Sequence, residues 1–288
     1  MRLGAPILDT YSSPDEWISL VRQLGASAAY CPLEVGAKPE QVDRYAQAAE
    51  AAGLVIAEVG AWEANPLSPD AAEAERSIAY CQEALRLADR IGARCCVNVA
   101  GSLGTSWAGP AAANFSQQTF RRIVETTQLI IDAVQPERTF YTLEIMPWIP
   151  PDDLDSYQRL IGAIDREAFA VHFDPANLVN DTRKYYSNGQ LISDFVRELG
   201  PLIRCCHVKD TRIDEHFPPW TVRFWECTPG AGNLDWPTLL AELSNVDSDL
   251  PLMLEHLETA EEYRIGMEYI RQTAETHNLE FAAATSMS

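Results

Sequence analysis

Residues 140–177 read FYTLEIMPWIPPDDLDSYQRLIGAIDREAFAVHFDPAN. The runs at 140–144 and 168–174 have the length and composition of buried strands. Between them, residues 152–164 carry apolar side chains at helical spacing. A strand, a helix and a second strand in this order predict a βαβ unit, because the helical crossover returns the chain to the same edge and makes the two strands parallel.

The same alternation runs along the whole chain. Further strands are expected at residues 3–8, 28–31, 54–59, 95–99, 203–208 and 252–255. Further helices are expected at residues 14–24, 39–52, 69–91, 116–134, 191–199, 236–243 and 260–276. Eight strand–helix units predict an α/β protein, a single-domain (β/α)₈ TIM barrel. We expect this barrel over residues 1–278 and a flexible C-terminal tail over 279–288.

The net charge is strongly negative, because 42 Asp and Glu face 22 Lys and Arg and give −20. Such a surface repels phosphodiester backbones and anionic lipids, so neither nucleic acid nor a membrane is an expected partner. The seven cysteines lack CxxC spacing, which is typical of buried thiols in a reducing compartment. Without a signal-peptide pattern or an apolar run of roughly 18–20 residues, a cytoplasmic protein is expected.

Four successive predicted strands each carry an ionisable side chain at the carboxyl end and on one face. These residues are Glu144, Asp174, His207 and Glu255. One acid at a strand end is usually solvated or caps a helix, but four in phase with the apolar alternation indicate a shared site at the barrel mouth. Three buried carboxylates and an imidazole need a compensating cation. Oxygen-rich ligation of this kind favours one divalent metal ion, Mn²⁺ first, with Mg²⁺, Zn²⁺ and Co²⁺ as alternatives.

Other polar and aromatic side chains fall near the same mouth. Lys209 shares the face of His207, where it could steady an oxyanion or protonate a leaving hydroxyl, or simply be a charged residue at the rim. Trp62 and Trp148 could stack on a sugar ring, or pack within loops. The candidates for lining a sugar pocket are Glu58, Trp62, Asn98, Trp148 and His172.

An ordered set of short motifs follows the predicted strands. The set comprises Leu143-Glu144, HFDPAN at 172–177, HVKD at 207–210 and PGAGNLDW at 229–236. In order and spacing it resembles the xylose isomerase-like family of TIM barrels, the sugar phosphate isomerases and epimerases. The resemblance covers nearly the whole chain.

The resemblance implies that the family's metal site falls on the same four ionisable residues. In the ketose epimerase branch the two glutamates, here Glu144 and Glu255, also form the acid/base pair. Asn177 stands where many members have a substrate-binding histidine. A substrate-binding arginine near the PGxG motif would be Arg212 or Arg223.

The sequence therefore predicts a divalent-metal-dependent isomerase or epimerase that acts on a keto-sugar or keto-polyol through an enediolate intermediate. Two alternatives remain open: a lyase of the inosose dehydratase type, which eliminates a β-hydroxyl or glycosidic group, and a non-catalytic sugar-binding barrel. The endonuclease IV branch needs more than the five histidines present. A small sugar or cyclitol is the expected partner, and a homodimer or homotetramer the expected assembly.

Overall fold

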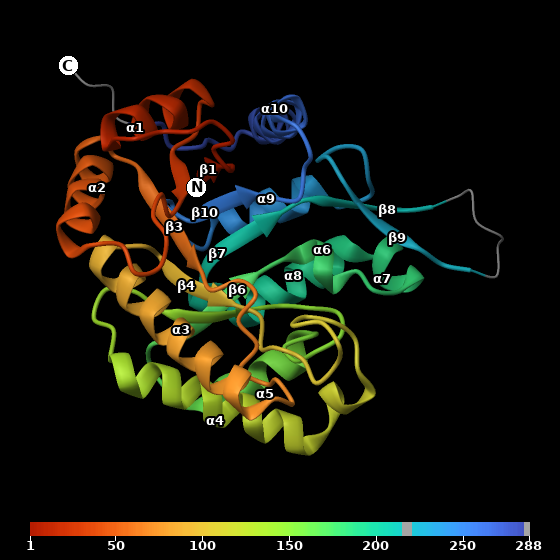
Figure 1. Ribbon diagram of the computed structural model, residues 1–288. Coiled ribbons are helices and arrows are strands. Elements are labelled where there is room, and N and C mark those ends of the chain that lie inside the picture. Colours follow the sequence, from red (N-terminus) through yellow and green to blue (C-terminus); the bar gives the residue numbers. More distant parts are fainter. Residues whose placement is uncertain (215–220, 285–288) are drawn as a thin grey trace.

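The computed structural model describes residues 1–214 and 221–284. Within these residues, parallel strands close into a barrel in the order β1-β10-β7-β6-β5-β4-β3-β2 (Figure 1). The strands are β1 (Arg2–Gly4), β2 (Ala28–Tyr30), β3 (Val55–Gly60), β4 (Cys95–Asn98), β5 (Tyr141–Glu144), β6 (Phe169–Phe173), β7 (Ile203–Val208) and β10 (Pro251–Leu254). The predicted eight-stranded barrel is confirmed.

Helices surround this barrel and connect successive strands (Figure 1). The connecting helices are α1 (Pro14–Gln23), α2 (Pro39–Ala51), α3 (Ala71–Ile91), α4 (Gln117–Val134), α5 (Leu154–Ile164), α8 (Asn188–Leu199) and α9 (Trp236–Ser244), and α10 (Ala260–Thr276) follows the last strand. Short helical turns occur between them at η1 (Ala112–Phe115), α6 (Pro175–Leu178), α7 (Thr182–Tyr186) and η2 (Gly200–Leu202). The sequence pattern missed these turns, because so few residues cannot show a period.

Capping residues explain where several helices begin. The Ser13 side chain accepts the N–H of Glu16 at the start of α1, whose first residue is a proline. Asp153 and Ser156 form a reciprocal capping box at the start of α5. These local signals lie in the sequence itself, which is why the predicted helix bounds are within a few residues of the observed ones.

Two apolar layers hold the barrel. The larger one lies between the strands and the helices and includes the fully buried Trp17, Phe195 and Trp236. The smaller one shares the strand face of the predicted site and fills the barrel interior beneath it. Its members are Ala28, Ala57, Cys95, Val97, Cys205 and Met253. Small side chains here leave room above them for polar groups.

The connection that follows β7 forms a hairpin of β8 (Asp210–Ile213) and β9 (Phe224–Cys227). The two strands are antiparallel, with Arg212 opposite Trp225. The hairpin projects from the body of the barrel (Figure 1). The sequence pattern did not predict these strands.

The flexibility of the tail from residue 279 stays a prediction, but the structure gives residues 279–284 contacts with the body of the protein. The backbone N–H of Ala282 donates to the carbonyl of Met1 at 2.9 Å, and Phe281 packs against the core. Residues 285–288 lie outside the described part of the chain. No described helix is both long and apolar enough to cross a membrane.

Candidate metal centre

Four ionisable side chains meet at the carboxyl end of the barrel strands. Glu144 ends β5 and His207 lies in β7. Asp174 and Glu255 directly follow β6 and β10. All four are buried, and they offer ligand atoms that lie within 4.8 Å of one another. Three carboxylates and one imidazole so close together form a candidate metal centre.

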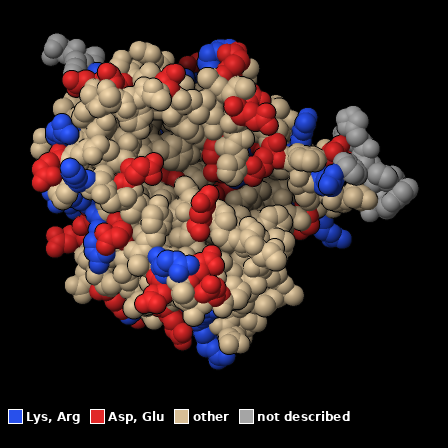
Figure 2. All heavy atoms as spheres, viewed as in Figure 1, with Lys and Arg blue, Asp and Glu red and all other residues tan. Residues whose placement is uncertain are grey.

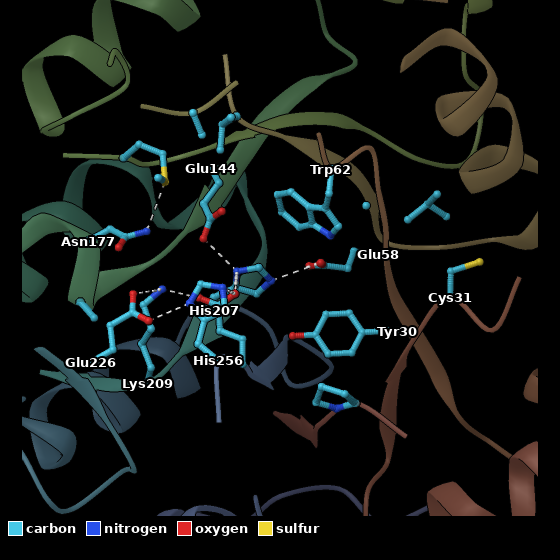
Figure 3. A pocket seen from close by; sticks show the side chains of 18 of the residues that line it. Tyr30, Cys31, Glu58, Trp62, Glu144, Asn177, His207, Lys209, Glu226 and His256 are labelled. Atoms are coloured by element: carbon cyan, nitrogen blue, oxygen red, sulfur yellow. Dashed lines mark hydrogen bonds and ion pairs between the residues drawn. The ribbon is translucent and has the colours of Figure 1, made fainter. Parts of the chain in front are cut away.

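His207 is the hub of this cluster (Figure 3). Its Nδ1 lies 2.9 Å from Glu144 Oε1 and 2.9 Å from Glu255 Oε2. Its Nε2 lies 3.2 Å from Glu58 Oε1. Burial alone would lower the pKa of His207, but the carboxylates of Glu255 and Glu58 raise it well above its ordinary value. The imidazole is therefore held as a cation among the protein's own groups.

Lys209 supplies the second buried positive charge. Its Nζ lies 2.6 Å from Asp174 Oδ2 and 3.3 Å from Glu226 Oε1, and it also contacts Glu255. The pKa of Asp174 is raised to about 7 despite the Lys209 ammonium. Burial is the main cause of this raised pKa, and the nearby carboxylates of Glu255 and Glu144 add to it.

Glu58 lies beneath His207 and also contacts two other buried side chains, His172 and Cys205. Its Oε2 lies 2.8 Å from His172 Nε2 and accepts a hydrogen bond from Cys205 Sγ at 3.2 Å. Burial opposes its ionisation, but His207 and His172 lower the pKa of Glu58 below its ordinary range. The register between β2 and β3 shifts by one residue just before Glu58, so both Ala57 and Glu58 reach the barrel interior.

The DPAN motif fixes the orientation of Asp174. Its Oδ1 accepts the backbone N–H groups of Ala176 at 2.9 Å and Asn177 at 3.1 Å, which caps α6. Pro175 occupies the first helical position, where its missing N–H costs nothing. Oδ2 is thereby left to face Lys209. The motif therefore orients one carboxylate oxygen of Asp174 toward the cluster.

The cluster opens into a cavity of about 1020 Å³. Figure 2 shows a hollow near the middle of this face, with Asp and Glu side chains around it. Of the predicted site residues, the cavity is lined by Glu58, Trp62, Glu144, Trp148, Asn177, His207, Lys209 and Glu255. Such a volume is at the upper end of the range for small-molecule sites.

An aromatic wall stands beside His207 (Figure 3). The ring of Trp62 lies 6.0 Å from the His207 ring, and that of Tyr30 lies 6.2 Å from it. The Tyr30 hydroxyl donates to the carbonyl of Leu254 at 3.0 Å. A Cβ at Gly60 would lie 2.0 Å from Trp62 Nε1, so the indole can take this position only because residue 60 has no side chain.

The prediction that Asn98 lines the pocket is not supported. Asn98 is fully buried, and its Nδ2 donates to Ala64 O at 3.2 Å and Cys81 Sγ at 3.4 Å. Cys95 belongs to the interior layer, whereas Cys96 packs on the outer face. Asn98 shares the face of Cys96, so it points toward the helices.

Three other predicted substrate contacts also lie off the cavity lining. His172 is fully buried below the site, where it holds Glu58. Arg212 and Arg223 are exposed on the hairpin, and the Arg223 guanidinium lies 5.5 Å from the Trp225 ring centroid. Both arginines lie outside the cavity lining although other hairpin residues belong to it. The sequence pattern could not predict this, because it does not give the register of the hairpin.

Glu226 and His256 also line the cavity, and the candidate site residues given above include neither. Glu226 Oε2 lies 2.7 Å from His256 Nδ1, next to Lys209 and Glu255. Strand alternation places His256 on the face opposite Glu255, but its left-handed backbone, with φ of 56°, turns the ring toward the cavity. Glu226 reaches the cavity because β9 pairs with β8 in the hairpin. Neither feature leaves a readable signal in the sequence.

The family model described as the xylose isomerase-like TIM barrel matches residues 18–273. This protein therefore belongs to the xylose isomerase-like TIM-barrel family, and the resemblance seen in the sequence motifs is confirmed. No match was found among curated proteins.

Solved structures of several functions share the fold. The probable 3-DHS dehydratase AsbF of Bacillus anthracis has a TM-score of 0.68 at 16% identity, over 93% of this chain and 98% of its own. D-psicose 3-epimerase of Clostridium cellulolyticum has a TM-score of 0.67 at 15% identity, over 95% and 99%. Endonuclease IV of Thermus thermophilus has a TM-score of 0.73 at 14% identity, over 96% and 100%. At such identities the likeness shows the fold, and the site must decide the function.

Proposed function

We propose that this protein is a divalent-metal-dependent isomerase or epimerase that acts on a keto-sugar or keto-polyol. The observation that carries this proposal is the pair of carboxylates, Glu144 and Glu255, that flank His207 at the same 2.9 Å and line one cavity. Two carboxylates that border one space can exchange protons with neighbouring positions of one substrate.

The donor set fits a divalent ion. The proposed ligands are Glu144, Asp174, His207 and Glu255, which combine three carboxylates with one imidazole. The carboxylates of Glu255 and Glu144 add to the effect of burial on the pKa of Asp174, and such an ion would offset their negative charge. When bound, the ion would polarise the substrate carbonyl as a Lewis acid and acidify the adjacent C–H.

The protein's own groups then move the proton. One glutamate of the pair removes it from the carbon next to the carbonyl, and the other returns a proton on the opposite face or at the neighbouring carbon. The first outcome is epimerisation and the second is isomerisation. Trp62 and Tyr30 border His207 and supply apolar surface for the C–H face of the sugar.

In this proposal Lys209 contacts two of the metal-ligand carboxylates and also donates to a substrate oxygen. The Lys209 ammonium already contacts Asp174 and Glu255, so it would share these two carboxylates with a bound ion. The carboxylates would then offer less charge to the ammonium, and the Lys209 N–H groups would be available to donate to a substrate oxygen.

A lyase is the second candidate, favoured by the acids beside Glu255. Lys209 and the His256–Glu226 pair line the cavity and could protonate a departing group. Removal of the same proton followed by loss of a β-substituent would then replace proton return.

The test is proton exchange in heavy water. We would incubate the purified protein with Mn²⁺ and a panel of keto-hexoses, keto-pentoses and inososes in D₂O and follow each sugar by NMR and mass spectrometry. We expect deuterium at the carbon next to the carbonyl together with an epimer or isomer. Loss of water or of a glycosidic group would instead establish the lyase.

The matched variants are Glu144→Gln in the cluster and Glu50→Gln on the exposed face of α2. Removal of one acid/base group should reduce exchange by about 10²–10⁴-fold, whereas Glu50→Gln should leave it unchanged. Equal exchange by Glu144→Gln and the wild type would contradict the assigned pair.

A further inference from the structure

The mouth of the cavity exposes two large aromatic side chains. Trp148 retains 41% of its surface exposed and Trp225 retains 47%. They are the exposed tryptophans of the described residues, and both line the cavity. Scattered single apolar residues on a surface are ordinary, but two exposed indoles on one cavity leave a large apolar area that a ligand could cover. We call Trp148 and Trp225 the rim tryptophans.

Both rim tryptophans are held in place by polar contacts. The carbonyl of Trp148 accepts a hydrogen bond at 3.0 Å from Nδ2 of Asn114, whose side chain is fully buried. The indole Nε1 of Trp225 donates to Asp214 Oδ2 at 3.0 Å. These contacts hold the backbone of Trp148 and the indole of Trp225, which reduces the entropy lost when a ligand binds.

The chemistry of the lining is divided between two zones. Glu144, Lys209 and Glu255 gather around His207, whereas Glu34 is a further carboxylate of the lining outside this group. Much of the remainder is apolar and includes Ile7, Leu33, Val35, Ala108, Met146 and Val179. A single sugar ring placed on the cluster has far fewer atoms than the ligands that fill cavities of this size.

The apolar part of the lining favours one of two kinds of substituent on the sugar, a second sugar ring or an aromatic group. Where it lay against these aliphatic side chains, a second sugar ring would lose water from its hydroxyl groups without gaining hydrogen-bond partners there, which is unfavourable. A planar aromatic group matches the faces of tryptophan and needs no hydrogen-bond partner. The occupant best suited to the rim is therefore aromatic.

We propose that the rim tryptophans form an aglycone subsite, and that the substrate is a keto-sugar bearing an aromatic substituent, an aryl glycoside. The sugar end of this inference rests on the proposed function at His207, and the aromatic end rests on the rim. Specificity thus resides in loop residues that take no part in proton transfer.

Binding without turnover tests the subsite. The probes are 2-naphthyl β-D-glucopyranoside, methyl β-D-glucopyranoside and 2-naphthol, titrated calorimetrically into the Mn²⁺-supplemented protein. We expect the naphthyl glucoside to bind more tightly than the methyl glucoside by about tenfold or more, since each tenfold corresponds to about 1.4 kcal/mol. We expect the Trp148→Ala/Trp225→Ala double variant to lose this difference and to bind the methyl glucoside as the wild type does.

Tyr186→Ala is the matched control, because Tyr186 is an aromatic residue that is 76% exposed and lies outside the cavity lining. It should keep the full preference. The subsite is refuted if the wild type does not bind the naphthyl glucoside, binds both glucosides equally, binds 2-naphthol as tightly as its glucoside, or keeps its preference in the double variant. Tight binding of the naphthyl glucoside without any deuterium exchange in the keto-sugar panel would keep the subsite and remove the proposed reaction.

Discussion

The floor and the rim of the cavity are built in opposite ways. The floor consists of charged side chains on strand ends, namely Glu58, Glu144, Asp174, His207, Lys209 and Glu255, and each is less than 9% exposed. The rim tryptophans come from a loop and a hairpin and are nearly half exposed. Buried charges must satisfy one another, so the floor has little freedom to change. Loops tolerate substitution, so the rim can set specificity while the floor keeps its chemistry.

We expect the largest loss of stability when His207, the central residue of the floor, is replaced. His207→Ala removes the cation that three carboxylates share, and leaving buried charges unpaired costs about 3–5 kcal/mol. We expect the free energy of unfolding, measured by urea denaturation, to fall by that order. His277→Ala, at an exposed position on the end of α10, is the control and should be nearly neutral. A hub variant as stable as this control would show that the floor is not held through His207.

A smaller effect should follow at the boundary between the two regions. Gly60→Ala places a methyl group where Trp62 Nε1 now lies, so the indole must leave its position beside His207. Overpacking of this kind costs typically about 1–3 kcal/mol, and KM for the keto-sugar should rise. In Gly162→Ala, the control in α5, the new methyl group meets nothing within 4 Å and should raise stability slightly. Unchanged KM in Gly60→Ala would remove Trp62 from the sugar site.

The floor should also respond to pH, whereas the rim should not. Asp174 has a pKa raised to about 7 and is therefore protonated below that pH, and His207, with its raised pKa, is protonated at neutral pH. Both must lose a proton to bind a metal ion. Affinity for Mn²⁺ should fall as pH falls, by about tenfold per unit for each proton released, and more steeply below about 7 than above it. Calorimetry in buffers of different ionisation enthalpy counts these protons. A pH-independent affinity would contradict the assigned ligands.

Most of the fold and the core of the site could be predicted from the sequence, because strand alternation and barrel closure together bring strand ends to one mouth. Glu144 and Asp174 followed directly from their strands. Asn98 was misassigned because all four residues of β4 are buried, so burial does not show which face points into the barrel. His256 and Glu226 depend on a left-handed backbone and on hairpin register, which arise from tertiary contacts rather than from a local pattern.

Metal content tests the central claim most directly. The purified protein, incubated with Mn²⁺ and freed of excess by gel filtration, would be analysed by inductively coupled plasma mass spectrometry beside Glu144→Gln and His207→Ala. The account predicts about one metal ion per chain in the wild type and a loss of that ion in His207→Ala, as expected for one site with one imidazole ligand. A wild type that retains no metal, or a His207→Ala variant that retains as much, would contradict it.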